Sequence, residues 1–174
     1  MEPTIKQEFI KGSLIENETA RVKIHIGFGC NANCVFCYYH KLLRTQNLPI
    51  ELINEQVKLV RDLGYKDVDF SGGESTIIPG FENVILLAKE LGFRRINIIT
   101  NGIMLSNEKF YSNLVNEGLN ETLFSLHGYP SDVHDSLVRI PGAFQKISNA
   151  MKIAKDLGVN VRTNITINNL NYKT

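Results

Sequence analysis

Residues 30–37 read Cys-Asn-Ala-Asn-Cys-Val-Phe-Cys, and they contain all three cysteines of this 174-residue chain. Three thiols within eight residues cannot all pair as disulfides, whereas thiolates this close together are typical metal ligands. A structural zinc site is usually closed by four protein ligands, often from two Cys-x-x-Cys pairs, and the sequence has no second pair. A cubane iron–sulfur cluster would instead use one cysteine for each of three irons and leave the fourth iron open.

The spacing Cys-x-x-x-Cys-x-x-Cys, with Phe36 just before the last cysteine, resembles the motif of the radical S-adenosylmethionine (radical SAM) enzymes. The resemblance implies a [4Fe–4S] cluster on Cys30, Cys34 and Cys37, whose open iron is chelated by the amino and carboxylate groups of S-adenosylmethionine. It also implies that Phe36 lies beside the adenine of that cofactor. The alternative is a Cys₃His zinc site that adds His40, although four ligands on one short loop would be crowded.

The composition is that of an ordinary globular protein, with 43% hydrophobic and 21% charged residues. Nineteen basic and eighteen acidic side chains give a net charge of +1, so electrostatics gives no reason to expect nucleic acid or a membrane as a partner. No apolar run is long enough to cross a bilayer or to act as a secretory signal. Cysteines without an export signal favour the reducing environment of the cytoplasm.

The chain alternates between two kinds of pattern. Residues 1–20 are polar and are expected to form a lead-in, with a short strand near residues 8–10. Apolar residues at every second position from 22 to 28 then predict a first strand that runs into the cysteine loop. Four helices are expected after it, each ending at a glycine that is followed by an apolar residue, an arrangement typical of helix C-termini. These glycines are Gly64, Gly92, Gly118 and Gly158.

Short runs rich in β-branched and aromatic residues follow these glycines and predict strands at 68–70, 96–99, 122–126 and 161–167. One-sided apolar stripes predict that the helices between them, the first at 51–63, lie on a sheet. The repeat predicts an α/β fold with a curved parallel sheet. The resemblance makes this a partial (β/α) barrel, a three-quarter barrel of six units. Only five are found, so residues 21–174 are expected to be a radical SAM core truncated after the fifth strand.

Ligands of parallel α/β folds bind at the loops that follow the C-terminal ends of the strands. Distinctive polar residues occur at each of these positions, and they are expected to ring one mouth together with the cysteine loop. They are Ser71-Gly72-Gly73-Glu74, Thr100-Asn101-Gly102, Ser125-Leu126-His127-Gly128 and, after the fifth strand, Asn168, Asn169 and Asn171.

The second of these loops looks like the Gly-Gly-Glu motif of radical SAM enzymes, which binds the methionyl amino group. Gly72 and Gly73 would let the backbone approach a ligand closely, and the Glu74 carboxylate could accept a hydrogen bond from an ammonium group. The family usually has proline after this glutamate, whereas this chain has Ser75. The structural alternative is a tight turn with a solvated acid.

The resemblance implies further site residues. Asn101 belongs to a strand ending common in the family, and Ser125 stands where the family places a group near the ribose or the methionyl carboxylate. Arg139 is a candidate partner for that carboxylate, because a guanidinium can bind it through two hydrogen bonds. A turn, an ordinary strand serine and a surface arginine are the respective alternatives. His127 replaces the aspartate of many peptide-modifying members and could contact substrate, transfer a proton or be structural, and His134 is expected to be structural.

The resemblance implies an enzyme that cleaves S-adenosylmethionine reductively and forms a 5′-deoxyadenosyl radical, which abstracts hydrogen from a substrate. No catalytic residue is assigned. A peptide or protein is the first expectation for the substrate, since residues 125–144 resemble peptide and protein maturases, and cofactor biosynthesis or methyl transfer is the second. An electron donor such as flavodoxin or ferredoxin is implied. A zinc-stabilised binding domain and an iron–sulfur electron carrier are alternatives that have no use for residues 72–74.

Overall fold

The computed structural model describes residues 21–39 and 46–173 of the chain. Strands and helices alternate along it, as expected from the sequence. The expected lead-in, the strand near residues 8–10 and the proposed zinc ligand His40 lie outside the described residues. The elements are β1 (Arg21–His25), α2 (Ile50–Asp62), β2 (Asp67–Ser71), α3 (Phe81–Glu90), β3 (Arg95–Thr100), α4 (Glu108–Glu117), β4 (Glu121–Ser125), α5 (Ser131–Val138), α6 (Ala143–Asp156) and β5 (Asn160–Asn164), with 3₁₀ turns η1 (Ser75–Ile77) and η2 (Met104–Ser106).

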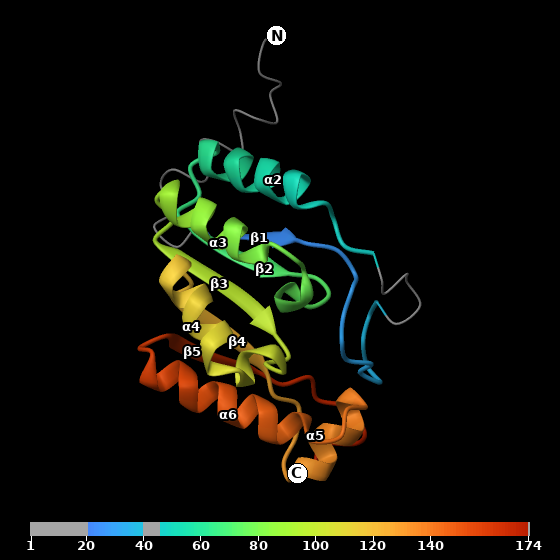
Figure 1. The fold of residues 1–174 in the computed structure, drawn as a ribbon. Coiled ribbons are helices and arrows are strands. Elements are labelled where there is room, and N and C mark those ends of the chain that lie inside the picture. Colours follow the sequence, from blue (N-terminus) through green and yellow to red (C-terminus); the bar gives the residue numbers. More distant parts are fainter. Residues whose placement is uncertain (1–20, 40–45, 174) are drawn as a thin grey trace.

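The five strands form one parallel sheet in the order β1-β2-β3-β4-β5. Each connection between neighbouring strands contains at least one helix (Figure 1), as parallel pairing requires. The sheet stays open, with β1 and β5 at its edges. The predicted α/β class and parallel sheet are therefore confirmed.

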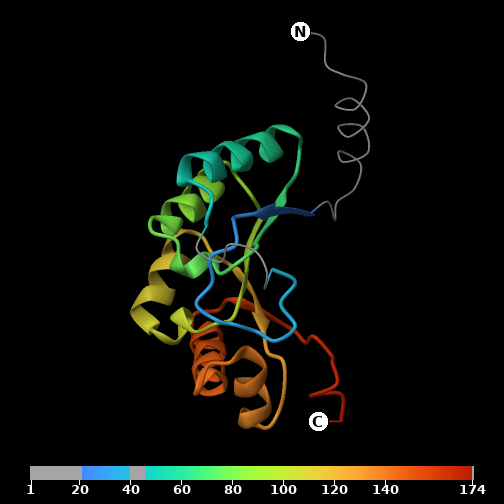
Figure 2. The same cartoon turned by 90° about the vertical axis from the view of Figure 1, so that its right-hand side faces the viewer.

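Helices α2, α3, α4 and α6 lie in a row against one face of this sheet (Figures 1 and 2). The side chains that alternate toward them, including Ile24, Phe70, Ile98 and Phe124, are at most 2% exposed. These strand residues and the apolar stripes of the helices form one hydrophobic core. Burial of this apolar surface, at about 25 cal/mol per Å², is the main stabilising contribution to the fold.

The helix ends follow the glycine pattern of the sequence. Gly92 has a left-handed φ of 76°, which costs a residue without a Cβ little. The next amide, of Phe93, donates to the carbonyl of Ala88 (3.1 Å) and closes the last turn of α3. The equivalent bonds end α2, α4 and α6, and they are Tyr65 N to Val60 O, Leu119 N to Leu114 O and Val159 N to Ala154 O.

Two details differ from the expectation of four helices and a long fifth strand. Helix α5 is an additional helix between β4 and α6, and its eight residues are too few to give a clear apolar period. Strand β5 ends at Asn164 rather than at residue 167. The apolar residues that suggested a longer strand, Ile165 and Ile167, are 56% and 74% exposed and lie beyond the pairing with β4.

The other face of the sheet carries charged and amide side chains within the first three residues of the strands. Arg21 donates to Asp69 (2.8 Å) and, through both terminal nitrogens, to Glu121 (2.8 and 3.0 Å). Arg162 of β5 also pairs with Glu121, and the Asn97 amide donates to Asp69 (2.8 Å). We call these five residues the amino-end network. It links all five strands without a metal ligand or a cysteine.

In the part of the chain that the structure describes, every helix is too short or too polar to cross a lipid bilayer.

Candidate functional site

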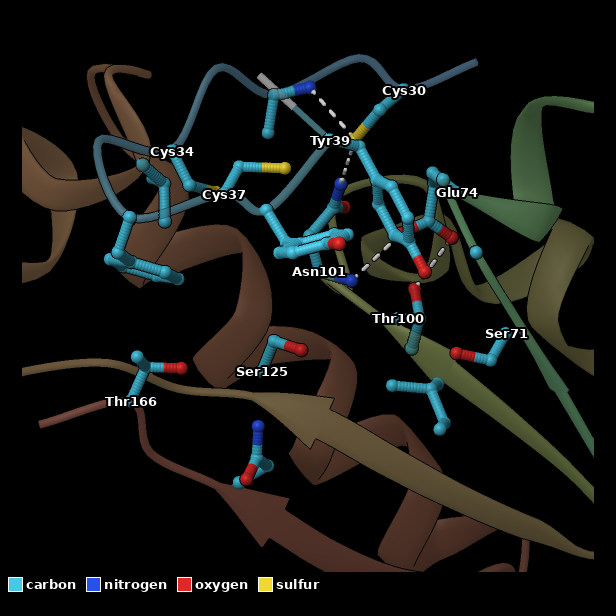
Figure 3. Close-up of a pocket in the computed structure, with 18 of the residues that line it drawn as sticks. Cys30, Cys34, Cys37, Tyr39, Ser71, Glu74, Thr100, Asn101, Ser125 and Thr166 are labelled. Carbon is cyan, nitrogen blue, oxygen red and sulfur yellow. Dashed lines mark hydrogen bonds between the residues drawn. The ribbon is translucent and has the colours of Figure 1, made fainter. Parts of the chain in front are cut away.

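The loop after β1 and the carboxyl ends of β2 to β5 surround a cavity of about 360 Å³ (Figure 3). This volume lies within the range of about 300–1,000 Å³ that is usual for small-molecule sites. Its walls come from the cysteine loop, the loop after β2 and the ends of β3, β4 and β5. The lining residues with polar or sulfur-containing side chains are Cys30, Cys34, Cys37, Tyr38, Tyr39, Ser71, Glu74, Thr100, Asn101, Ser125, His127, Asn164 and Thr166.

The cysteine loop is fixed to α5 by its main chain. The amides of Asn33 and Val35 donate to the carbonyls of Val138 (3.1 Å) and Leu137 (2.9 Å). These carbonyls belong to the last turn of α5, where no later residue of the helix can donate to them. The loop thus completes the hydrogen bonding of α5, and α5 holds it over the cavity. Its three cysteines are partly exposed and line the cavity, as predicted (Figure 3).

Gly72 and Gly73 contact the backbone of the cysteine loop. The amide of Gly73 donates to the carbonyl of Gly27 (2.8 Å) and that of Glu74 to the carbonyl of Gly29 (2.7 Å). A Cβ on Gly73 would lie 1.9 Å from the Gly29 oxygen, and one on Gly72 would lie 2.5 Å from the Gly27 oxygen. The two glycines are therefore needed for packing within the protein, in addition to the ligand approach predicted from the sequence.

Glu74 lines the cavity but is only 1% exposed. Its Oε1 accepts from Thr76 N (3.2 Å), Thr76 Oγ1 (2.6 Å) and Thr100 Oγ1 (2.8 Å), and its Oε2 accepts from Asn101 N (2.8 Å). Burial raises the pKa of Glu74, while these hydrogen bonds oppose the rise. All four donors are neutral, so the described residues supply hydrogen bonds to this carboxylate without a salt bridge. The alternative in which Glu74 is a solvated acid on a tight turn is therefore wrong.

Asn101 connects the end of β3 to the cysteine loop. Its Nδ2 donates to Asn31 Oδ1 (2.7 Å) and lies 3.9 Å from Cys30 Sγ, while its Oδ1 accepts from Ile103 N (3.0 Å). The amide of Ala32 also donates to Cys30 Sγ (3.4 Å). Cys30 Sγ therefore has hydrogen-bond donors both from its own loop and from the residue that follows β3.

The far wall of the cavity is formed by β4 and β5. Ser125 lines it, as predicted. Asn164, paired in register with Ser125, and Thr166 also line it but were missed, because the expected strand ran to residue 167. The signal that could have identified Asn164 is a polar residue on the fifth strand, beside the polar Ser125 at the end of the fourth.

The asparagines expected at the mouth after β5 do not line the cavity. Asn171 is 6% exposed and its side-chain amide donates to the carbonyls of His127 (2.6 Å) and Thr166 (2.8 Å). Asn168 stabilises the same turn by accepting from Leu170 N (2.8 Å), and Asn169 is exposed. These residues shape the segment that carries Thr166.

Phe36 and His127 meet across the cavity, with ring centroids 4.6 Å apart in an edge-to-face arrangement. Nδ1 of His127 accepts from Thr166 N (3.1 Å), so the proton of the neutral ring is on Nε2. The main-chain amide of His127 donates to Nδ1 of His134 (3.1 Å), which is 1% exposed. Burial and the nearby His134 lower the pKa of His127 to about 4, and burial lowers that of His134.

Among the residues that the resemblance assigned to the cofactor, Arg139 is the one that the structure does not bring to the cavity. It ends α5 in a left-handed conformation (φ 58°), its side chain is exposed, and it is not among the lining residues. This placement matches the alternative given above, in which Arg139 is a surface arginine.

The donor set fits an iron–sulfur cluster, because Cys30, Cys34 and Cys37 line one cavity and each cysteine of a cubane site binds a different iron. Among residues 21–39 and 46–173, no three histidine, cysteine or acidic side chains are arranged to hold a single metal ion.

Comparison with protein families identifies the class. Residues 24–173 match the model of the Radical SAM superfamily, so the chain belongs to this superfamily of enzymes. The [4Fe–4S] cluster and S-adenosylmethionine are the cofactors of the family, as the cysteine motif indicated. The alternatives of a zinc-stabilised binding domain and a simple electron carrier are therefore set aside.

The relatives of known identity point to two kinds of reaction. The chain is 29% identical over 168 residues to the sporulation killing factor maturation protein SkfB of Bacillus subtilis, covering 93% of this chain and 39% of SkfB. It is also 29% identical over 152 residues to the GTP 3′,8-cyclase of Aquifex aeolicus, covering 84% and 47% of the two chains. The chain thus spans less than half the length of these relatives.

A solved structure with the same fold is SuiB of Streptococcus suis, bound to its precursor peptide SuiA. The two chains share 21% identity with a TM-score of 0.67, over 83% of this chain and 32% of SuiB. SuiB has also been solved with S-adenosylmethionine. At this identity the comparison establishes the fold and leaves the substrate open.

Proposed function

We propose that the protein is a radical SAM enzyme that modifies a peptide or protein. When bound, the cluster and S-adenosylmethionine supply reductive cleavage of the cofactor and a 5′-deoxyadenosyl radical that abstracts hydrogen from the substrate. The observation that carries the proposal is the placement of three cysteines and the cofactor-type residues around one cavity. The similarity to SkfB over 93% of the chain favours a peptide as the substrate.

Under this proposal, each predicted site residue that lines the cavity has a defined task. Cys30, Cys34 and Cys37 would hold the cluster. Phe36, whose ring is fixed edge-to-face by His127, would lie against the adenine.

The remaining cofactor contacts would come from the strand ends. The loop of Gly72, Gly73 and Glu74 would bind the methionyl amino group, since Glu74 is a buried carboxylate that lines the cavity and accepts hydrogen bonds only from neutral donors of the described residues. Asn101 and Ser125 would contact the polar end of the cofactor from β3 and β4. Arg139 is left out of this set, because it does not line the cavity.

The second candidate is a reaction of cofactor biosynthesis on a small molecule, which the similarity to GTP 3′,8-cyclase favours. It uses the same cofactor residues and differs only in the substrate. An external electron donor such as reduced flavodoxin or ferredoxin would serve either reaction.

The test is anaerobic incubation of the iron- and sulfide-reconstituted protein with S-adenosylmethionine and reduced flavodoxin, followed by quantification of 5′-deoxyadenosine. We expect 5′-deoxyadenosine from the wild type and none from the variant in which Cys30, Cys34 and Cys37 are all alanine, because that variant has no cysteine left in this sequence. Full iron content in the triple variant, or no product from an iron-loaded wild type, would contradict the proposal.

Two probes then separate the substrate classes. We expect the precursor peptide of sporulation killing factor to increase 5′-deoxyadenosine formation and to acquire a mass change, and we expect GTP to have no effect. The reverse result would support the small-molecule reaction. Deuterium transfer from a labelled peptide into 5′-deoxyadenosine would identify the peptide as the source of the abstracted hydrogen.

A further inference from the structure

A continuous chain of hydrogen bonds joins the Gly-Gly-Glu loop to the first cysteine. Glu74 receives the main-chain amide of Asn101 at 2.8 Å, and Asn101 reaches Asn31 Oδ1 at 2.7 Å and Cys30 Sγ at 3.9 Å through Nδ2. The amide of Glu74 makes a second connection to the cysteine loop by donating to the carbonyl of Gly29, next to Cys30. The loop after β2, the end of β3 and the cysteine loop are thus connected around Cys30 (Figure 3).

The orientation of the Asn101 side chain is fixed at both of its ends. Its Oδ1 accepts from Ile103 N at 3.0 Å, so its amide nitrogen must point the other way, toward Asn31 and Cys30. Its main chain is held by Glu74, a group that is 1% exposed and anchored by two threonines. An asparagine held in this way loses little entropy when it donates to a ligand sulfur.

Most of the Glu74 carboxylate is used inside the protein. A carboxylate offers about four lone-pair positions, and four donors from the chain already occupy its two oxygens. The Glu74 side chain therefore holds the loop after β2 and the end of β3 together through hydrogen bonds, whether or not a cofactor ammonium group adds one further contact at Oε2. Removing it would leave buried donors without a partner, which is costly.

We propose that Glu74, acting through Asn101, is a positioning residue for the cysteine loop and for the hydrogen bonding of the Cys30 sulfur, independently of S-adenosylmethionine. The inference rests on the proposed function in placing the cluster on Cys30. It adds a task for Glu74 beyond contact with the methionyl amino group. Donors to a ligand sulfur stabilise the more negative, reduced cluster, so this arrangement raises the reduction potential.

The first experiment measures the protein without metal or cofactor. Hydrogen–deuterium exchange of residues 27–37 is compared between wild type, Glu74→Gln and Asn164→Ala, since Asn164 lines the far wall of the cavity and takes no part in the hydrogen bonds that join Glu74, Asn101 and Cys30. We expect exchange to be roughly tenfold faster in Glu74→Gln, as the loss of about one buried hydrogen bond predicts, and unchanged in Asn164→Ala. Equal exchange in Glu74→Gln and wild type would overturn the loop-positioning role.

The second experiment measures the reduction potential of the reconstituted cluster, by electron paramagnetic resonance titration without S-adenosylmethionine. We expect a lower potential in Glu74→Gln and in Asn101→Ala, no further decrease in the double variant, and the wild-type value in Asn164→Ala. Wild-type potentials in both single variants, with only weaker cofactor binding in Glu74→Gln, would overturn the proposal. Asn101→Ala keeps Glu74 and its threonine partners, so it remains informative if Glu74→Gln fails to fold.

The two experiments also separate this inference from the proposed function. A wild-type protein that binds no cluster would refute the function, yet the exchange measurement would still decide whether Glu74 holds the loop. A wild type that binds the cluster and cleaves S-adenosylmethionine, combined with unchanged exchange and potential in the variants, would refute the inference alone.

Discussion

The two ends of the same sheet handle buried carboxylates in opposite ways. At the amino ends of the strands, Glu121 and Asp69 are paired with Arg21 and Arg162. At the carboxyl ends, Glu74 is more deeply buried but receives only neutral donors from threonines and an asparagine. The carboxylates at the amino ends have cationic partners within the protein, whereas Glu74 at the carboxyl ends has only neutral partners among the described residues and is open to a cationic ligand.

The difference separates stability from function on one scaffold. Paired charges that link neighbouring strands hold the sheet together and need no ligand. A buried carboxylate without a cationic partner is unfavourable for folding alone, and such groups occur where a ligand or a chemical step requires them. Cysteines, glycines and amides gather at the carboxyl end for the same reason, because the loops there can vary without disturbing the core.

The largest effect that would test this comparison is expected at the amino end. Glu121→Ala leaves two arginines without their shared carboxylate and should lower the free energy of unfolding by about 3 kcal/mol, measured by urea denaturation of the metal-free protein. Glu121→Gln keeps an acceptor for Arg21 and should cost less. The affinity for S-adenosylmethionine, measured on reconstituted protein, should stay unchanged in both. Weaker cofactor binding with normal stability would show that the two ends are not separate.

A smaller effect is expected from pH, through His127 near the cavity. Burial lowers its pKa from 6.5 to about 4 in the folded state, so between these values the unfolded state binds the proton and the folded state does not. Stability contributed by the neutral ring is therefore lost as the pH falls through this window, by about 2 kcal/mol between pH 7 and pH 5. Urea denaturation at several pH values measures it.

His127→Asn is the control for this pH dependence. Its side-chain oxygen can still accept from Thr166 N, but it cannot titrate, so the slope of stability against pH should become shallower between pH 7 and pH 5. The remaining slope reports other groups, among them His134, whose pKa is also lowered by burial. An unchanged slope in His127→Asn would contradict the assignment of this pH effect to His127.

The smallest effect is expected at Arg139. Because its side chain is exposed and does not line the cavity, Arg139→Ala should change the affinity for S-adenosylmethionine by less than about twofold, the range of an ordinary surface substitution. Isothermal titration of reconstituted protein would measure it. A loss of tenfold or more would restore Arg139 as the carboxylate partner that the family resemblance suggested.

Features that depend on neighbours in the chain could be predicted from the sequence. The glycine helix ends, such as Gly92 followed by Phe93, were located correctly because they follow from backbone conformation and one local hydrogen bond. The first strand followed from alternation and the later strands from runs of β-branched and aromatic residues. The rule that ligands bind at carboxyl strand ends then placed the cysteines and Glu74 at one cavity. The fifth strand was too long because exposed Ile165 and Ile167 imitate a buried pattern.

The sequence by itself determined the α/β class, the parallel sheet and the grouping of Cys30, Cys34 and Cys37, because periodicity, glycine conformation and short spacing are local properties. Only the tertiary structure decided that Gly73 packs on Gly29, that Glu74 holds Asn101, and that Asn164 enters the cavity while Arg139 does not. These contacts join residues far apart in the chain, and they depend on how strands and loops meet in space, which no local pattern encodes.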